Sequence, residues 1–247
     1  MSSLPISIVL EGASNVRDLG GYRGAGGQLM RRGLVFRSAA LATLTDADLQ
    51  TLGALGIRTV CDFRGEAERA RAPTRLTEPE NVPLPIEPSV GAGLRDLLAR
   101  QEQTGEALHA VLQQAYVSYA LEHHAQYARL FAKLLAGGTP LLFHCSAGKD
   151  RTGFGAALLL TALGVAWDDV VADFEATNRL WARDTVPAAD IPESVREALL
   201  RADARLLTAA FDAVRERYGS MEGYFFDCLG LDTAALREML LEPGPSD

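Results

Sequence analysis

The sequence predicts an α/β fold in which a central, mostly parallel sheet is flanked by helices. Short apolar, strand-like segments lie in the first part of the chain, a strand–loop–helix unit lies in the middle, and helical periodicity fills most of the rest. The chain has 247 residues, of which 48% are apolar and 23% charged, as in an ordinary globular protein. This length suits one hydrophobic core, so we expect residues 1–247 to form a single domain.

The first third of the chain alternates between turns and short elements. Glycines at 20, 21, 24, 26 and 27 divide residues 1–40 into short strands and turns. Thr45, with Asp48 three residues later, predicts the start of a helix that ends at Gly56. Residues 57–63 are mostly apolar and predict a buried strand.

A proline-rich connection precedes a long helical region. Residues 73–88 contain five prolines and predict a connection with a short strand at 82–86. Residues 91–135 show helical periodicity. The side chains that share one face are Leu112, Tyr116, Tyr119, His123, Tyr127 and Leu130. We expect residues of about 91–136 to form a helical insertion or lid.

The centre of the chain carries the candidate functional segment. Residues 140–144 predict a short apolar strand, residues 156–163 predict an apolar helix, and three further helical stretches are expected up to Leu241. Residues 144–153 connect this strand to a helix that we expect to begin just after Arg151, and read His-Cys-Ser-Ala-Gly-Lys-Asp-Arg-Thr-Gly. Ligands of open α/β sheets bind at the carboxyl ends of the strands, so this loop is the predicted site.

The loop has the residues of a phosphate site. Backbone N–H groups that converge before a helix bind anions, and the helix dipole adds positive potential. We therefore expect the amides of Ser146, Ala147 and Gly148 to bind phosphate, with Gly148 supplying the backbone freedom that a tight ring needs. His144 is predicted to orient the loop by hydrogen bonds.

Cys145 is the predicted nucleophile. Only the thiolate form of cysteine attacks, and a helix N-terminus with neighbouring cations, here Lys149 and Arg151, favours that form. The forked guanidinium of Arg151 can clamp two phosphate oxygens at once. The hydroxyl of Thr152 is expected to donate a hydrogen bond to the sulfur when the sulfur departs in a second step.

Residues 144–153 resemble the signature of the cysteine-dependent protein tyrosine phosphatase superfamily: His, Cys, five residues, Arg, Thr, Gly. The Gly-Lys-Asp-Arg form is similar to the bacterial atypical branch, whose members act on phosphotyrosine and often on phosphoinositides. Residues 15–22, 34–38 and 61–66 resemble further segments of that branch in the same order. This resemblance spans about residues 13–180. It implies a phosphatase-like fold, a cysteinyl-phosphate intermediate, dual-specificity activity, and neither metal nor cofactor.

The resemblance also implies that Asp150 is the general acid that protonates the leaving oxygen. Many members of the superfamily take this acid from a loop further upstream, but no aspartate lies between Asp96 and Asp150. Asp62 is the reserve candidate, and Glu102 and Glu106 are weaker ones. Asp62 has two open interpretations, a substrate contact or a local ion pair with Arg64.

Lys149 adds a second cation to the loop and predicts a preference for substrates with several phosphates. The expected partners are therefore a phosphotyrosine protein or a phosphoinositide. Asn15, Arg17 and Asp18 are expected to be structural. Two other functions remain to be weighed. One is a sulfur-transfer enzyme, a class whose loop resembles this one but has fewer residues between cysteine and arginine. The other is a non-catalytic phosphate-binding module. The five-residue spacing and the intact residues Cys145, Arg151 and Thr152 favour the phosphatase.

Composition excludes several other classes of protein. The net charge of −8 argues against nucleic-acid binding. The three cysteines, at 61, 145 and 228, suggest no disulfide framework and so favour a reducing, cytoplasmic compartment. The N-terminus has no signal-peptide pattern, and the longest apolar stretch, 156–166, is too short to span a membrane.

Overall fold

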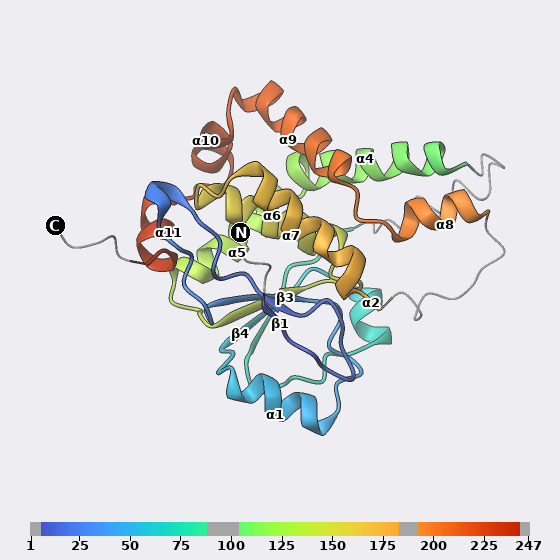
Figure 1. Ribbon diagram of the computed structural model, residues 1–247, viewed down its shortest axis with the longest axis vertical. Coiled ribbons are helices and arrows are strands. Elements are labelled where there is room, and N and C mark those ends of the chain that lie inside the picture. Colours follow the sequence, from blue (N-terminus) through green and yellow to red (C-terminus); the bar gives the residue numbers. More distant parts are fainter. Residues whose placement is uncertain (1–5, 88–103, 183–191, 243–247) are drawn as a thin grey trace.

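A mostly parallel sheet forms the centre of the protein (Figure 1). The computed structural model describes residues 6–87, 104–182 and 192–242. The strands are β1 (Ile6–Ser7), β2 (Arg17–Asp18), β3 (Val35–Ser38), β4 (Thr59–Asp62), β5 (Glu80–Pro83) and β6 (Leu141–His144), in the spatial order β1-β2-β3-β6-β4-β5. Strands β3, β6, β4 and β5 run parallel, whereas β1 and β2 add an antiparallel edge. The predicted fold class is confirmed.

Helices cover both faces of this sheet. They are α1 (Asp46–Ala54), α2 (Glu66–Arg71), α4 (Gly105–Leu121), α5 (His124–Leu135), α6 (Asp150–Ala162), α7 (Trp167–Leu180), α8 (Glu193–Leu200), α9 (Ala204–Tyr218), α10 (Met221–Gly223) and α11 (Thr233–Leu240). Short helical turns occur at η1 (Ala25–Gly27) and η3 (Tyr224–Cys228). Figure 1 shows α1 on one face and α5, α6 and α7 on the other. None of the described helices combines the length and apolar character of a membrane-spanning segment.

Alternating side chains of the central strand build two cores. Leu141 and Phe143 of β6 point into the large core beneath the helical layer, whereas Leu142 packs with the smaller core that includes Leu52 of α1. All three β6 side chains are fully buried. Burial on both faces explains why residues 140–144 form a continuous apolar run rather than an alternating one.

Most predicted elements are present, but several predictions were wrong in detail. The strand predicted at 82–86 is β5, at Glu80–Pro83, and the helix expected just after Arg151 begins at Asp150. The helix after Thr45 is confirmed, and its capping box is complete: Asp48 N donates to Thr45 Oγ1 at 3.2 Å, and Thr45 N donates to Asp48 Oδ2 at 2.9 Å. The helical region predicted from 91 breaks at residues 122–123 into α4 and α5, while its residues 91–103 lie outside the described part. More than three helical stretches follow residue 163, because short loops divide that region at 201–203 and 219–220.

The register of the parallel strands places three polar residues side by side at the carboxyl edge of the sheet. Ser38 of β3 and Asp62 of β4 both pair with His144, the last residue of β6. The next residue is Cys145, so the sheet delivers the predicted nucleophile to the edge where ligands of such sheets bind.

Candidate active site

The loop between β6 and α6 turns its carbonyl oxygens outward. Ser146 O accepts from the Ala40 amide at 3.0 Å. Asn15 Nδ2 donates to Ala147 O at 3.2 Å and to Gly148 O at 2.9 Å. The amides of residues 146–149 have no hydrogen-bond acceptor among the described residues. Because other elements bind the carbonyls and these N–H groups have no acceptor among the described residues, the amides are available to an anion, as an anion site requires.

Gly148 makes the tight turn of this loop possible. Its φ angle of 65° lies in the left-handed region, and a Cβ atom there would stand 2.4 Å from the backbone oxygen of Ser38. Any side chain would therefore push the loop away from β3. The sequence prediction that this position needs glycine has a steric basis.

Arg151 lies at the rim of the loop and is held by Glu68 of α2. Arg151 Nη1 donates to Glu68 Oε2 at 2.7 Å, and Nη2 donates to Oε1 at 2.9 Å. The Ser146 hydroxyl donates to the same carboxylate at 2.5 Å. Burial opposes ionisation of Glu68, but these contacts outweigh it and lower the pKa to about 2. The Nε atom of Arg151 has no partner among the described residues, so this edge of the guanidinium is available to a phosphate oxygen.

Asp150, the predicted acid, lies in the first turn of α6. Its Oδ1 accepts from the Tyr116 hydroxyl at 3.0 Å and stands 3.4 Å from Lys149 Nζ. The carboxylate side chain is 16% exposed, so it is held in place and still reaches the surface. Of the weaker candidates, Glu106 lines a separate pocket between α4, α8 and α9, and Glu102 lies outside the described residues.

Lys149 was expected to offer a second cation to the phosphates of a substrate, but its side chain points to α8. Its ammonium group is 2% exposed and donates to the backbone carbonyls of Leu199 at 2.5 Å and Arg201 at 3.3 Å. It also stands 6.0 Å from the centre of the Trp181 ring. The group thus caps the C-terminal end of α8, whose carbonyls attract a cation. In this conformation its hydrogen bonds go to the protein.

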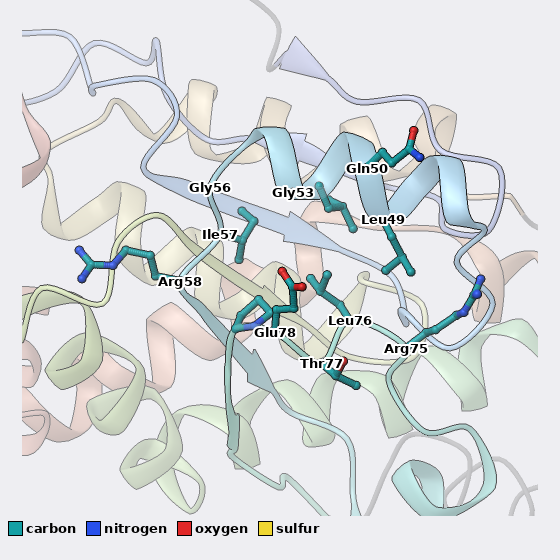
Figure 2. A pocket seen from close by; sticks show the side chains of 12 residues that line it. Leu49, Gln50, Gly53, Gly56, Ile57, Arg58, Arg75, Leu76, Thr77 and Glu78 are labelled. Atoms are coloured by element: carbon teal, nitrogen blue, oxygen red, sulfur yellow. The ribbon is translucent and has the colours of Figure 1, made fainter.

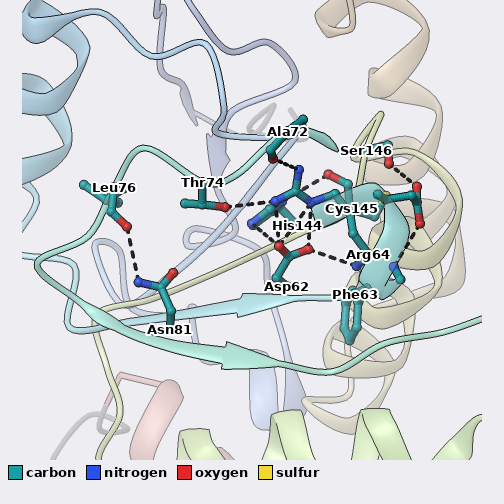
Figure 3. A network of polar contacts seen from close by, with 12 residues as sticks. Asp62, Phe63, Arg64, Ala72, Thr74, Leu76, Asn81, His144, Cys145 and Ser146 are labelled. Atoms are coloured by element: carbon teal, nitrogen blue, oxygen red, sulfur yellow. Dashed lines mark hydrogen bonds and ion pairs between the residues drawn. The ribbon is translucent and has the colours of Figure 1, made fainter. Parts of the chain in front are cut away.

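Asp62 forms a local ion pair with Arg64, which was one of the two roles that the sequence left open for it. Arg64 donates to both carboxylate oxygens, the closest contact being 2.7 Å, and the Arg64 amide donates at 2.9 Å (Figure 3). His144 Nε2 lies 3.7 Å from the same carboxylate, and Nδ1 lies 3.1 Å from Cys145 O. Burial lowers the pKa of His144, so the ring is neutral at pH 7. These contacts fit the orienting role predicted for His144.

Cys145 and Thr152 complete the set of predicted residues. Cys145 is 2% exposed at the base of the loop. The buried hydroxyl of Thr152 has no hydrogen-bond partner among the described residues, so it can still donate a hydrogen bond. Burial raises the pKa of the Cys61 thiol to about 12, which marks that cysteine as a core residue.

Sequence reasoning missed Glu68 and Tyr116 as parts of this site. Glu68 lies in an exposed-looking Arg/Glu-rich helix, and only the fold brings α2 to the loop. Tyr116 was predicted as a core residue of a helical face, which it is, but its hydroxyl also holds Asp150. Its helical spacing carried no signal for that second contact.

One pocket of about 710 Å³ lies away from the loop (Figure 2). It opens between α1 and residues 75–79, and its lining includes Leu49, Ile57 and Leu76. None of residues 144–153 lines it. Among the described residues, no three His, Cys, Asp or Glu side chains are placed to share a metal ion.

Comparison with known proteins gives a consistent result. Residues 8–242 match the profile described as "Tyrosine phosphatase family". A protein of Cupriavidus necator that is named as a tyrosine-protein phosphatase, without an established activity, is 36% identical over 233 residues, which cover 91% of this chain and 84% of the relative. The "triple specificity protein phosphatase PtpB" of Mycobacterium tuberculosis is 33% identical over 270 residues, covering 93% of this chain and 96% of the relative.

A solved structure, TpbA of P. aeruginosa, aligns with a TM-score of 0.37 and 16% identity over 77% of this chain and 96% of that one. That likeness is too distant to support a statement about this chain.

Proposed function

Since the chain belongs to the tyrosine phosphatase family, we propose that it hydrolyses phosphate monoesters, phosphotyrosine above all, in two displacements at Cys145. The observation that carries this proposal is the loop itself. Its carbonyls accept hydrogen bonds from other elements, and among the described residues neither its amides nor the Nε atom of Arg151 has a partner. A tetrahedral dianion fits such a site through short, charge-assisted hydrogen bonds.

In the first displacement the sulfur of Cys145, as thiolate, attacks the phosphorus atom. The S–P bond forms while the bond to the tyrosine oxygen breaks, and Asp150 gives its proton to that oxygen. The loop amides and Arg151 then hold the equatorial oxygens, where charge is spread in the transition state. Tyr116 keeps the Asp150 carboxyl at the mouth of the site.

In the second displacement water attacks the phosphorus atom of the cysteinyl phosphate. The S–P bond breaks, inorganic phosphate leaves, and Asp150, now ionised, takes the proton from the water. The unpartnered hydroxyl of Thr152 supports this step, because a hydrogen bond to the departing sulfur stabilises the returning thiolate.

The proposed substrate range is that of a dual-specificity phosphatase. "Triple specificity" is the description of PtpB, a relative that matches nearly the whole chain. Phosphoinositide hydrolysis stays a prediction of the sequence. Its arguments were the resemblance to the bacterial atypical branch and the charge of Lys149, and that ammonium group donates to the carbonyls of α8.

A substrate panel tests the proposal. Phosphotyrosine, phosphoserine and phosphothreonine peptides and a phosphoinositide are offered to the wild type and to Cys145→Ser. We expect turnover of the phosphotyrosine peptide by the wild type, inhibition by vanadate, and no turnover by the variant. A chelator should have no effect. Phosphate release by Cys145→Ser at the wild-type rate would refute the proposal, and turnover of thiosulfate instead of any phosphate ester would favour sulfur transfer.

A further inference from the structure

A buried cluster of charges lies behind the phosphate loop. It consists of Arg17 of β2, Arg37 of β3 and Asp173 of α7, whose side chains are 0%, 0% and 1% exposed. Asp173 bridges the two arginines, with Oδ1 2.9 Å from Arg17 Nε and Oδ2 2.5 Å from Arg37 Nη1. None of the three side chains has an assigned role in the reaction proposed above.

Arg37 connects this cluster to the loop. Its Nη2 donates to the carbonyl of Gly148 at 2.8 Å. The strand register sets Arg37 opposite Phe143 and Ser38 opposite His144, so the Arg37 side chain lies just under the turn that carries Cys145. The hydrogen bond to Gly148 holds the Arg37 guanidinium against the same loop that carries Cys145, three residues before Gly148.

The other charged pairs around the loop are balanced. Arg151 is paired with Glu68, Arg64 is paired with Asp62, and the ammonium of Lys149 stands 3.4 Å from Asp150. The titratable and charged groups that face the loop from the elements packed on it are Arg17, Arg37, Asp62, Arg64, Glu68, Tyr116, Tyr119, Tyr127, His144, Lys149, Asp150, Arg151 and Asp173. The tyrosines are neutral at pH 7, because burial raises their pKa values.

The cluster behind the loop is not balanced. Two guanidinium groups face one carboxylate, which leaves one positive charge in excess. Burial and the nearby Arg17 lower the pKa of Arg37 to about 10, so it is still protonated at pH 7. Tyr22 donates to Asp173 at 3.4 Å and adds no charge. Within the described residues, Arg37 Nε has no partner, so the guanidinium is not saturated.

We propose that Arg37 stabilises the thiolate of Cys145 from beneath the loop, as a positioning residue that never touches substrate, and that Asp173 limits this effect. The inference rests on the proposed role of Cys145 as the nucleophile. Cys145 is 2% exposed, so water solvates its sulfur little and nearby excess charge acts on it strongly. The cluster supplies this charge at a distance from the rim, where it does not compete for substrate oxygens.

The test is the pH dependence of alkylation of Cys145 by iodoacetamide, followed on the peptide that contains Cys145. Arg37→Met removes the excess charge and should move the midpoint of the profile upward by about one pH unit. Asp173→Asn removes the opposing carboxylate and should move it downward. Arg37→Lys keeps the charge but loses the fork, so its midpoint should stay close to that of the wild type.

Shifts of opposite sign separate charge from structural damage, which would move both midpoints the same way. Thermal melting identifies variants that do not fold. If Arg37→Met does not fold, the other two variants decide: a downward shift in Asp173→Asn with no shift in Arg37→Lys supports the inference. A folded Asp173→Asn whose midpoint is unchanged or raised overturns it. A wild type that hydrolyses no phosphate ester would refute the proposed function. Alkylation needs no turnover, so it would still show whether Arg37 affects the reactivity of Cys145.

Discussion

At the scale of single residues, Glu68 decides, under the proposed function, how Arg151 would meet a phosphate. The carboxylate takes the Nη1–Nη2 edge of the guanidinium and also accepts from Ser146. It thereby aims the remaining Nε edge, but it also brings a negative charge close to an anionic substrate. These two effects have opposite signs, and a substitution shows which one is larger.

We expect Glu68→Gln to lower kcat/KM about tenfold, mainly through kcat, because a guanidinium that is no longer held loses its alignment with the transition state. Steady-state kinetics on an aryl phosphate measures both constants. Glu66→Gln, an exposed change in the same helix, is the matched control and should behave like the wild type. A rise in kcat/KM in Glu68→Gln would instead identify Glu68 as a competitor of the substrate.

The role of Asp150 as general acid can be tested with substrates whose leaving groups differ in their need for a proton. Proton transfer contributes on the order of 10²-fold or more to such a step. We therefore expect Asp150→Asn to lower kcat by about that factor for phosphotyrosine, and far less for an aryl phosphate whose leaving group needs no proton. Equal rates for wild type and variant on phosphotyrosine, at the pH optimum, would move the role of acid to another residue.

The sequence predicted the loop residues because their chemistry is local. Cys145, Gly148 and Arg151 are close in the chain, and the strand before them and the helix after them are recognisable. Glu68 and Asp173 reach the loop only through the fold, 83 and 22 residues away from Arg151 in the chain. No local pattern marks them. Lys149 shows the converse limit, since its partners, the carbonyls at the end of α8, are backbone atoms that no side-chain pattern predicts.

At the scale of elements, Lys149 joins α8 to the loop between β6 and α6. Its ammonium group caps the carbonyls of Leu199 and Arg201 and is almost fully buried. Asn178 of α7 holds the adjoining chain, with its Nδ2 donating to Ala202 O at 2.9 Å. The C-terminal ends of two helices are therefore fixed next to the loop.

Lys149→Met should loosen α8, because it leaves partly buried carbonyls without a donor, at a cost of roughly 1 kcal/mol. Hydrogen exchange measures this directly: we expect faster exchange of the α8 amides (residues 193–200), with little change in α6. Lys133→Met, which removes an exposed ion pair with Glu80, is the control and should leave α8 unchanged. Unaltered exchange in α8 of Lys149→Met would mean that the cap does not hold the helix.

Element boundaries were predictable where the signal is a cap or an apolar run. The capping box at Thr45 and the run at 140–144 gave α1 and β6 nearly to the residue. The break between α4 and α5 was not predictable from the sequence. The apolar positions keep their spacing across the break, although His123 leaves the helical conformation. The helical periodicity of a sequence indicates which side chains are buried. A break in the helix that keeps the same side chains buried therefore leaves the periodicity unchanged.

At the scale of the whole molecule, the sheet gathers buried carboxylates around one edge. Burial opposes their ionisation, but cations and hydrogen bonds hold the pKa values of Asp62, Asp173 and Glu68 below their usual range. A lowered pKa in the folded state means that stability is present above the unfolded-state pKa and is lost as the pH falls through the folded-state value. The protein should therefore lose stability in acid.

For Glu68 the window runs from its usual pKa of 4.5 down to about 2. Urea unfolding at several pH values should show the free energy of unfolding falling as the pH is lowered through this window. Glu68→Gln should show a shallower fall, because one proton fewer is taken up on unfolding. A slope as steep in Glu68→Gln as in the wild type would show that its ion pair adds nothing to acid stability.

The account as a whole depends on a covalent bond between phosphorus and the sulfur of Cys145. Rapid acid quenching during turnover of phosphotyrosine, followed by mass spectrometry of the peptide that contains Cys145, tests this most directly. We predict that a phosphoryl group appears on that peptide in the wild type within the first turnover and is absent from Cys145→Ser. Turnover at the full rate with no phosphoryl group on Cys145 at any time would contradict the account.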